Sequence, residues 1–130
     1  MPDKTLIEEA TIARENASAR FSNFKVGAAL RTVSGKIYRG CNVENATYGL
    51  TVCAERVALL SAIAAGDRKF DAIAVVTQSD EPSTPCGPCR QLMWEYCGDI
   101  DVILSNLSEV KRRLRLSQLL PLPFDARLLE

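Results

Sequence analysis

Residues 53–66, CAERVALLSAIAAG, carry the strongest helix signal in this 130-residue chain. Alanine and leucine favour helix, and Gly66 is placed to end the helix as a C-terminal cap. Apolar side chains cover nearly every face, which is typical of a buried helix and not of an amphipathic surface helix. We therefore expect other elements to enclose it, and the flanking segments indicate what those elements are.

Upstream of this helix, the sequence predicts another helix and a β-hairpin. Residues 25–33 and 36–44 are two strand-like runs joined by a Ser-Gly pair at 34–35 that favours a tight turn. Residues 3–21 place apolar side chains three or four positions apart, which is the spacing of one helix face. Asp3 is placed to cap that helix. Its apolar positions are Leu6, Ile7, Ala10, Ala13 and Ala17.

Downstream, strand and helix signals alternate. Residues 71–78, DAIAVVTQ, form a short apolar run that predicts a strand, and residues 100–105, IDVILS, predict another. Between them, residues 86–98 predict a helix. Pro88 is tolerated in the first turn of that helix, and Gly98 ends it.

The last segments predict an edge strand and an irregular tail. Residues 109–116, EVKRRLRL, alternate Val110, Leu114 and Leu116 with charged side chains, so KRRLR is interpreted as a solvated strand face. The tail at 116–130 contains two prolines that forbid a long helix. The chain shows no repeat or linker, so we expect a single domain over residues 1–130. Its element order predicts an α/β fold in which helices cover one mixed sheet.

Composition excludes several classes of protein. Lys and Arg number 16, as do Asp and Glu, so the formal net charge is zero, whereas non-specific binding to nucleic acid requires a basic surface. No apolar run approaches the ~20 residues of a membrane span. Residues 1–17 lack the apolar region of a secretion signal. We expect a cytoplasmic protein with neither a nucleic-acid nor a membrane partner.

The cysteine and histidine counts restrict the chemistry of any site. Five cysteines, an odd number, fit poorly with a disulfide framework, and cytoplasmic thiols stay reduced. The chain contains no histidine. A transition-metal site would therefore depend mainly on sulfur and carboxylate, and a general base would be a carboxylate or another group.

Three of the cysteines lie at predicted helix starts. Cys53 opens the helix at 53–66, and Cys86 and Cys89 open the helix at 86–98. A helix N-terminus favours the thiolate, which is the form that binds zinc, and residues three apart share a helix face. If the two helix starts meet, three thiolates converge and leave a fourth tetrahedral position open, as in a catalytic zinc site.

Two other interpretations of these cysteines remain open. Cys86 and Cys89 have the C-x-x-C spacing of a redox pair, although that leaves Cys53 unexplained. A closed structural zinc site would need Cys41 or Cys97 as a fourth ligand. Cys97 is a poor candidate because eight helical residues separate it from Cys89 by ~12 Å. Cys41 is more simply explained as a small buried side chain.

Glu55 and Arg56 follow Cys53 in the same predicted helix. Glu55 could be no more than a carboxylate placed favourably at a helix N-terminus. Beside a three-thiolate zinc, it could instead move protons as a general acid–base. Arg56 could be a solvated side chain, or it could donate to the sulfurs and offset the net charge of −1 on the zinc cluster.

Four segments together resemble the small zinc-dependent cytidine deaminases of nucleoside salvage. CAE followed some 30 residues later by PCGPC is similar to the zinc signature of nucleoside deaminases. The segments are RFSNFKVGAAL at 20–30, GCNVENATYGLTVCAER at 40–56, PCGPCRQLMWE at 85–95 and LLPLPF at 119–124. The likeness covers nearly the whole chain.

This resemblance implies roles for residues at the zinc site. Cys53, Cys86 and Cys89 would hold one zinc ion per chain, Glu55 would shuttle protons, and Arg56 would bond to the ligand sulfurs. The implied fold is a three-layer α/β/α sandwich with a mixed five-stranded sheet.

The resemblance also implies roles in substrate binding. Phe24 would pack against the pyrimidine ring, Ala54 would contact the substrate, and Asn42 and Glu44 would hold the ribose hydroxyls. Asn42 and Glu44 are two apart on a predicted strand, so their side chains point to one face.

In this family the active sites are shared within a homotetramer, and Tyr48 and Phe124 would come from neighbouring subunits. The ending LPLPFDARLLE departs from the family pattern around Phe124.

The implied activity is hydrolytic deamination of cytidine and 2′-deoxycytidine to uridine and 2′-deoxyuridine, in which zinc-bound hydroxide attacks C4 of the base. One alternative is a zinc deaminase of another substrate, such as a blasticidin-type antibiotic, guanine or cytosine in a nucleic acid. The nucleic-acid enzymes usually have histidine as the first ligand, which this chain lacks. Another alternative is a non-enzymatic module with structural zinc.

Overall fold

The computed structural model describes residues 3–108 and 111–129, and its strands form one sheet in the order β2-β1-β3-β4-β5. Strands β3 and β4 are parallel and the other neighbours antiparallel, so the sheet is mixed. The elements are α1 (Asp3–Arg14), β1 (Gly27–Thr32), β2 (Ile37–Cys41), α2 (Ala54–Ala64), β3 (Phe70–Thr77), α3 (Gly87–Cys97), β4 (Asp101–Asn106), β5 (Lys111–Arg115) and α4 (Leu116–Leu119), with short 3₁₀ turns at Tyr48–Leu50 and Ala126–Leu129.

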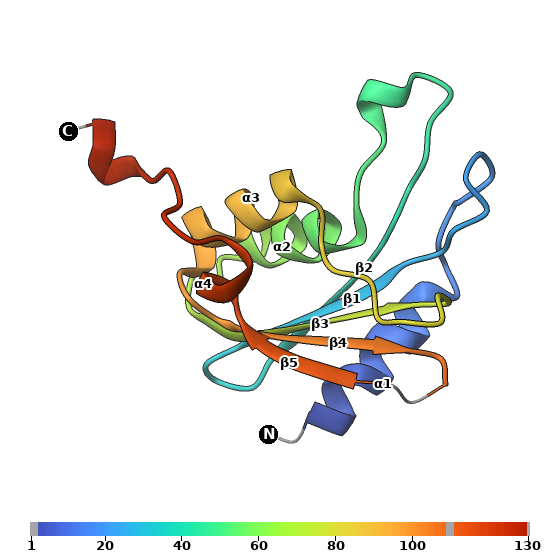
Figure 1. Cartoon of the computed structure of the whole chain (residues 1–130), viewed down its shortest axis with the longest axis horizontal. Coiled ribbons are helices and arrows are strands. Elements are labelled where there is room, and N and C mark those ends of the chain that lie inside the picture. Colours follow the sequence, from blue (N-terminus) through green and yellow to red (C-terminus); the bar gives the residue numbers. More distant parts are fainter. Residues whose placement is uncertain (1–2, 109–110, 130) are drawn as a thin grey trace.

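Helices cover both faces of this sheet, with α1 on one face and α2 and α3 on the other (Figure 1). Successive residues of a strand point to opposite faces, so the inner strands β1, β3 and β4 supply both layers of core. On β1, Leu30 packs with Leu59 of α2, whereas Ala29 packs with Leu6 of α1. The α/β fold with a mixed five-stranded sheet between helices is therefore confirmed.

Two glycines let helices approach the sheet closely. A Cβ at Gly40 of β2 would lie 2.3 Å from the carbonyl oxygen of Ala54, and a Cβ at Gly27 of β1 would lie 2.0 Å from that of Ala10. Both spacings are too short for any side chain. Gly40 thus allows the first turn of α2, directly after Cys53, to lie on the sheet.

The first helix is shorter than predicted. It ends at Arg14 instead of extending to residue 21, and Ala17 lies outside it. Ser18 donates its backbone N–H to the Asn42 carbonyl (2.9 Å) and bridges Val43, so contacts with a distant segment replace the helical bonds. Asp3 is the first residue of the helix rather than its cap, and its carboxylate binds Arg113.

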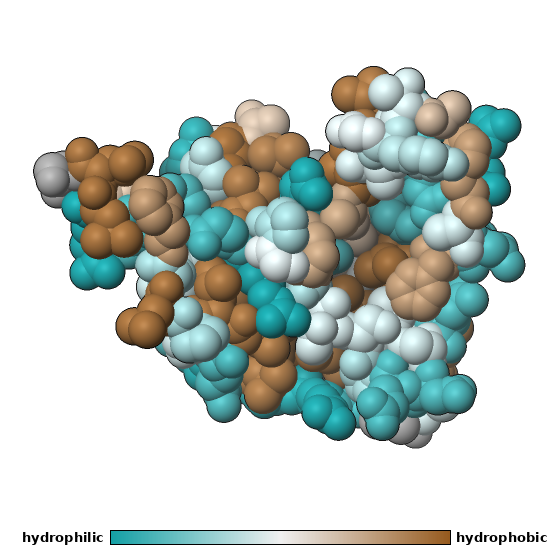
Figure 2. Space-filling model, turned by 45° about the horizontal axis from the view of Figure 1, so that its top comes forward, coloured by the Kyte–Doolittle hydropathy of each residue, from teal (hydrophilic) through white to brown (hydrophobic). Residues whose placement is uncertain are grey.

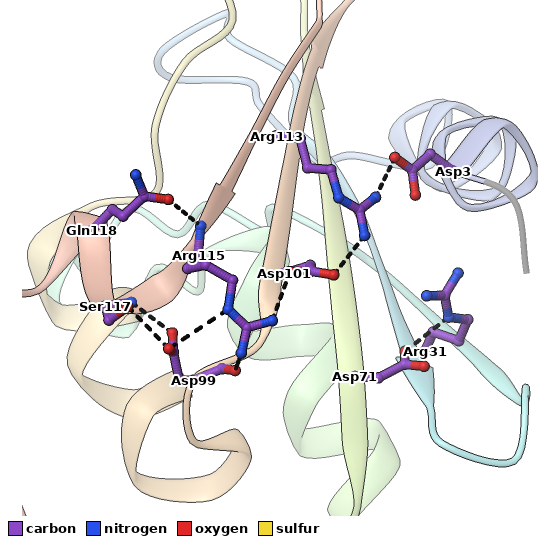
Figure 3. Close-up of polar contacts among 9 residues, drawn as sticks. All are labelled: Asp3, Arg31, Asp71, Asp99, Asp101, Arg113, Arg115, Ser117 and Gln118. Atoms are coloured by element: carbon purple, nitrogen blue, oxygen red, sulfur yellow. Dashed lines mark hydrogen bonds and ion pairs between the residues drawn. The ribbon is translucent and has the colours of Figure 1, made fainter.

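The predicted edge strand is confirmed over Lys111–Arg115, where β5 lies at one end of the sheet with exposed charged side chains. Val110 lies outside the described residues. Leu116, which the sequence assigned to that strand, is buried and begins α4. Figure 3 shows Arg113 between Asp3 and Asp101, and Arg115 also bound to Asp101 (2.7 Å).

Among the described residues, no helix is both long enough and apolar enough to cross a membrane.

Candidate metal centre and substrate cavity

Three cysteine sulfurs meet where helices α2 and α3 begin. Cys53 and Cys86 are the residues directly before these helices, both with extended backbone, and Cys89 lies in the first turn of α3. The Sγ atoms of Cys53 and Cys86 are 3.9 Å apart, and those of Cys86 and Cys89 are 3.3 Å apart. All three sulfurs lie within 4.8 Å of one another. The two helix starts thus place their thiols together, as the sequence predicted.

This donor set fits zinc. Over the described residues, these three cysteines are the only group of three or more cysteine, aspartate or glutamate side chains placed to hold one metal ion. Thiolate sulfurs are favoured zinc ligands, and the N-terminal ends of two helices favour negative charge at this point. A redox pair of Cys86 and Cys89 alone would give no reason for the approach of Cys53.

The protonation of these thiols is coupled. A hydrogen bond with Cys89 is the largest influence that lowers the pKa of Cys53, to about 5, and the charge of Arg56 lowers it further. The same contact with Cys53 raises the pKa of Cys89, and burial raises it further. One thiolate is therefore favoured before any metal is present, and a metal would displace the remaining protons.

The other two cysteines lie outside the sulfur cluster. Cys41, on β2, and Cys97, at the end of α3, are both partly buried. Burial raises the pKa of each, to about 12 for Cys97. Neither belongs to the group that could hold a metal, so the described residues do not supply the fourth sulfur of a closed structural site.

Glu55 lies in the first turn of α2 and is only 4% exposed. Its side chain lines the same cavity as Cys53 and Cys86. Burial raises the pKa of this carboxyl, and the nearby charge of Cys53 also raises it. A glutamate that serves only the helix dipole would be expected in solvent, so its burial beside the sulfurs favours a chemical role.

Arg56 turns toward the sulfurs rather than into solvent. Its Nη2 lies 3.8 Å from Cys53 Sγ, and hydrogen bonding to Cys89 raises the pKa of the guanidinium. Its Nε is buried without a hydrogen-bond partner among the described residues. This cation faces a site where negative charge gathers, which agrees with the compensating position inferred from the sequence.

A cavity of about 280 Å³ opens beside this cluster. It lies between the loop that carries the 3₁₀ turn at Tyr48–Leu50 and the body of the molecule, where Figure 2 shows a hollow. Of the predicted site residues, it brings together Phe24, Asn42, Glu44, Cys53, Ala54, Glu55 and Cys86. Cys89 is fully buried and does not line it. The remaining lining residues are Ser22, Val26, Thr51, Val52, Val75, Thr77, Ser83 and Thr84.

Asn42 and Glu44 both line the cavity and organise the loop that carries Phe24, although they follow β2, which ends at Cys41, instead of lying on a strand as predicted. Asn42 accepts the backbone N–H of Val26 (2.9 Å) and donates to the Phe24 carbonyl (2.9 Å). Glu44 accepts the backbone N–H of Ser22 (2.9 Å) and its hydroxyl. Hydrogen bonds from Ser22 lower the pKa of Glu44, so this carboxylate keeps its charge.

The other two predicted substrate contacts lie outside this cavity within one chain, with Tyr48 in an adjoining depression that shares Ser22, Glu44 and Thr51 with it. Tyr48 is 77% exposed in the 3₁₀ turn and touches Phe21 edge-on, with ring centroids 6.2 Å apart. Phe124 is 56% exposed in the tail, and its carbonyl accepts a hydrogen bond from Gln91 of α3. Neither aromatic ring lines the cavity of its own chain.

Sequence reasoning missed the wall formed by Thr77, Ser83 and Thr84. Thr77 lies one residue before the end of the strand predicted over 71–78 and is the last residue of β3, and ligand sites of α/β sheets often lie at such strand ends, so its position could have indicated a role. Ser83 and Thr84 belong to an irregular segment whose path depends on tertiary contacts, and their only signal was their place just before the PCGPC segment.

Comparison with known proteins identifies relatives of this chain. Residues 1–105 match the family described as "Cytidine and deoxycytidylate deaminase zinc-binding region". The chain is 49% identical to the cytidine deaminase of Halalkalibacterium halodurans over 97% of this chain and 96% of that protein.

A solved structure of cytidine deaminase from Burkholderia pseudomallei is 53% identical, with a TM-score of 0.93 over 95% of this chain and 100% of that one. A more distant relative, the blasticidin-S deaminase of Bacillus cereus, is 32% identical over 91% of each chain.

Proposed function

The chain belongs to the cytidine and deoxycytidylate deaminase family, and we propose that it hydrolyses the 4-amino group of cytidine and 2′-deoxycytidine. The products are uridine or 2′-deoxyuridine and ammonia. The observation that carries the proposal is the meeting of three thiols and the buried Glu55 at one cavity. In this proposal residues 1–130 act as one deaminase domain.

Cys53, Cys86 and Cys89 would hold one zinc ion per chain, since they bring three soft ligands together at two helix starts. When bound, zinc supplies the Lewis acidity that makes a water molecule nucleophilic at neutral pH. Arg56 offsets the negative charge of the three thiolates through its contact with Cys53.

Glu55 would move the protons of the reaction. From its place beside Cys53 on the cavity wall, its carboxylate takes a proton from the attacking water and gives it to N3 of the pyrimidine, which makes C4 more electrophilic. It then takes the second proton of that water from the new hydroxyl on C4 and delivers it to the departing amine, so that the C4 carbonyl forms and ammonia leaves instead of an amide anion. Burial excludes bulk water from this exchange, and positioned proton transfer typically contributes about 10²- to 10⁴-fold to the rate.

Other cavity residues would bind and orient the nucleoside. Phe24 offers an aromatic face to the base, and the first turn of α2 brings Ala54 beside it. Asn42 and Glu44, which also line the cavity, would be the hydrogen-bonding partners for ribose hydroxyls. The loop contacts that they already make hold them in a fixed orientation.

The charge of the cavity favours a nucleoside over a nucleotide. Its described lining contains two carboxylates, Glu44 and Glu55, and neither lysine nor arginine. A 5′-phosphate would meet negative charge without a cationic partner, which costs binding energy. The chain has zero net charge, which also disfavours a nucleic-acid substrate.

We further propose a cytoplasmic homotetramer in which Tyr48 and Phe124 complete the cavities of neighbouring subunits. The support is their exposure, since large aromatic side chains left in solvent are common at interfaces. A reducing compartment suits a site built from three thiols.

A substrate panel tests the function. The purified holoenzyme is incubated with cytidine, 2′-deoxycytidine, cytosine, 2′-deoxycytidine 5′-monophosphate, guanine and blasticidin S, and loss of the amine is followed by ultraviolet absorbance. We expect turnover of the two nucleosides and little of the others. Preferential turnover of blasticidin S or guanine would instead support a deaminase of another substrate. If none reacts while zinc is bound, the non-enzymatic zinc module becomes the better explanation.

A further inference from the structure

The carboxyl ends of β3 and β4 lie side by side at the edge of the sheet where the cavity opens. These strands are parallel, and their last residues, Thr77 and Asn106, are paired in register. The segment 78–85 leaves β3 at this edge and runs to Cys86 at the start of α3. It forms one wall of the cavity through Ser83 and Thr84 but contains neither helix nor strand to hold its shape.

Asn106 binds this segment from the neighbouring strand. Its side-chain Nδ2 donates to the carbonyl of Ser79 (3.1 Å) and to the carbonyl of Asp80 (2.6 Å). Its Oδ1 accepts the backbone N–H of Ser108 (2.9 Å). Both amide hydrogens are therefore used on the 78–85 segment. The residue is only 5% exposed, so these bonds form largely out of competition with water.

Three hydroxyl groups extend this anchoring from the turn to the wall. Thr77 Oγ1 lies 2.8 Å from Ser79 Oγ, and Ser79 Oγ lies 2.9 Å from Ser83 Oγ. Thr77 and Ser83 are also linked directly, at 3.3 Å. A change in the carbonyl positions that Asn106 fixes would thus be passed through Ser79 to Ser83, which faces the cavity.

We propose that Asn106 is a positioning residue, which sets the cavity wall at Ser83 and Thr84 and thereby the binding of the nucleoside. It does not itself line the cavity, so it acts only through the 78–85 segment. The expected effect of Asn106 on KM and kcat rests on the deaminase function proposed above. The cysteine ligands are held separately, since Arg90 binds the Pro85 carbonyl (2.7 Å) and the sulfurs lie at helix starts.

The test compares Asn106 variants with a control on the same strand. Asn106→Asp keeps the size of the side chain but replaces its donor group with an oxygen that faces two carbonyls. Asn106→Ser is the test variant if Asn106→Asp fails to fold. The control is Ile103→Val, because Ile103 is 2% exposed on β4 and packs in the core on the α1 side. It lowers stability without touching the 78–85 segment.

Five quantities are measured on the zinc-loaded proteins: KM and kcat for cytidine, zinc per chain, Tm, and hydrogen exchange of peptides spanning the 78–85 segment. We expect the Asn106 variants to raise KM on the order of 10-fold with a smaller change in kcat, because binding depends on the wall whereas the reacting groups stay in place. In these variants we expect zinc to stay at one ion per chain and hydrogen exchange of the 78–85 segment to become faster. Ile103→Val lowers Tm but changes neither KM nor exchange.

Asn106 variants that lose Tm as the control does, with unchanged KM and unchanged exchange of 78–85, would overturn the proposal and leave Asn106 a purely stabilising residue. Failure of the unsubstituted protein to deaminate cytidine would refute the proposed function instead. Exchange would then still decide whether Asn106 holds the segment, because it requires no substrate.

Discussion

The environment of each thiol determines whether it can serve a metal. Cys89 lies 3.3 Å from Cys86 Sγ at a helix start, whereas burial raises the pKa of Cys97 to about 12 at the far end of the same helix. We expect Cys89→Ser to lose both zinc and activity. The matched control Cys97→Ser keeps both, because it lies outside the cluster. Zinc per chain, measured by atomic emission, and turnover of cytidine check this prediction.

Full turnover by metal-free protein would contradict the assignment of zinc to this cluster. Loss of zinc from Cys97→Ser would show instead that a fourth cysteine takes part.

The carboxyl of Glu55 is the group whose chemistry can be removed with least change in shape. Glu55→Gln replaces a proton carrier with an amide of the same size, so kcat should fall by at least about 10²-fold. Zinc content and nucleoside binding, measured by calorimetry, should be retained, since the sulfurs and the rest of the cavity are unchanged. A variant with nearly normal kcat would mean that Glu55 only fills a buried position in the first turn of α2.

Residues governed by local rules were predictable from the sequence, and those placed by distant contacts were not. Helix-start chemistry indicated Cys53, Cys86 and Cys89 as thiolate candidates, and i, i+3 spacing placed Cys86 and Cys89 on one helix face, whereas the meeting of all three was implied by the family resemblance. Ser83 and Asn106 obey no such rule. Their places depend on how an irregular segment folds over the ends of two strands, which propensity and periodicity do not determine.

At the scale of elements, the distinction between local rules and distant contacts explains which helices and strands were predicted and where their predicted ends were wrong. The existence of α2 and the alternation of strands and helices were correctly predicted, because hydrophobic pattern indicates both. The expectation that other elements enclose α2 on nearly all faces was wrong: one face packs in the core, whereas Leu60 is 49% exposed and Ser61 and Ala64 are also exposed.

Helix α1 ends early because Ser18 pairs with the segment after β2, and no local signal announces that partner. The short α4 begins where the backbone N–H of Arg115 donates to Gln118 Oε1 (2.8 Å), although alternation had assigned Leu116 to a strand.

The edge strand β5 is attached to its neighbours by carboxylates that carry a pH dependence. Burial raises the pKa of Asp101, but bonding to Arg115 and the charge of Arg113 more than offset this, so its pKa lies below the ordinary 3.8. At Asp99, burial likewise raises the pKa, but hydrogen bonds from Ser117 lower it by more, so the pKa of Asp99 also lies below its ordinary value. A carboxylate with a lowered pKa stabilises the fold above its unfolded pKa and loses that contribution as pH falls through the folded value.

Acid should therefore release the network shown in Figure 3. We expect Tm to fall as pH drops below about 4 toward ~2, because protonation removes the charge that binds both arginines. Asp101→Asn should lower Tm near neutral pH, and its difference from the unsubstituted protein should shrink over this acid range. Thermal unfolding followed by circular dichroism at a series of pH values measures both curves. A difference that stays constant down to pH ~2 would contradict the role of the Asp101 charge.

At the scale of the whole molecule, one chain leaves a large apolar surface uncovered. Hydrophobic side chains gather on the C-terminal segment at the left end of Figure 2, where Leu122 is 99% exposed and Leu129 is 76% exposed. Tyr48 projects from a different part of the molecule and is also exposed. Surfaces of this kind are typical of subunit contacts, which is why the proposed assembly bears on the active site.

Shared active sites make a prediction that mixing of subunits can test. Glu55→Ala removes the proton carrier from a chain, and Phe124→Ala removes the aromatic ring that this chain would lend to a neighbour. Each homogeneous variant should be nearly inactive. When the two are mixed under conditions that allow subunits to exchange, some sites combine an intact Glu55 with an intact Phe124 from different chains, so cytidine turnover should reappear. If Phe124 serves only its own chain, every site stays incomplete. An inactive mixture, with exchange confirmed by native mass spectrometry, would therefore exclude Phe124 from sharing while leaving the sulfur site and Glu55 untouched.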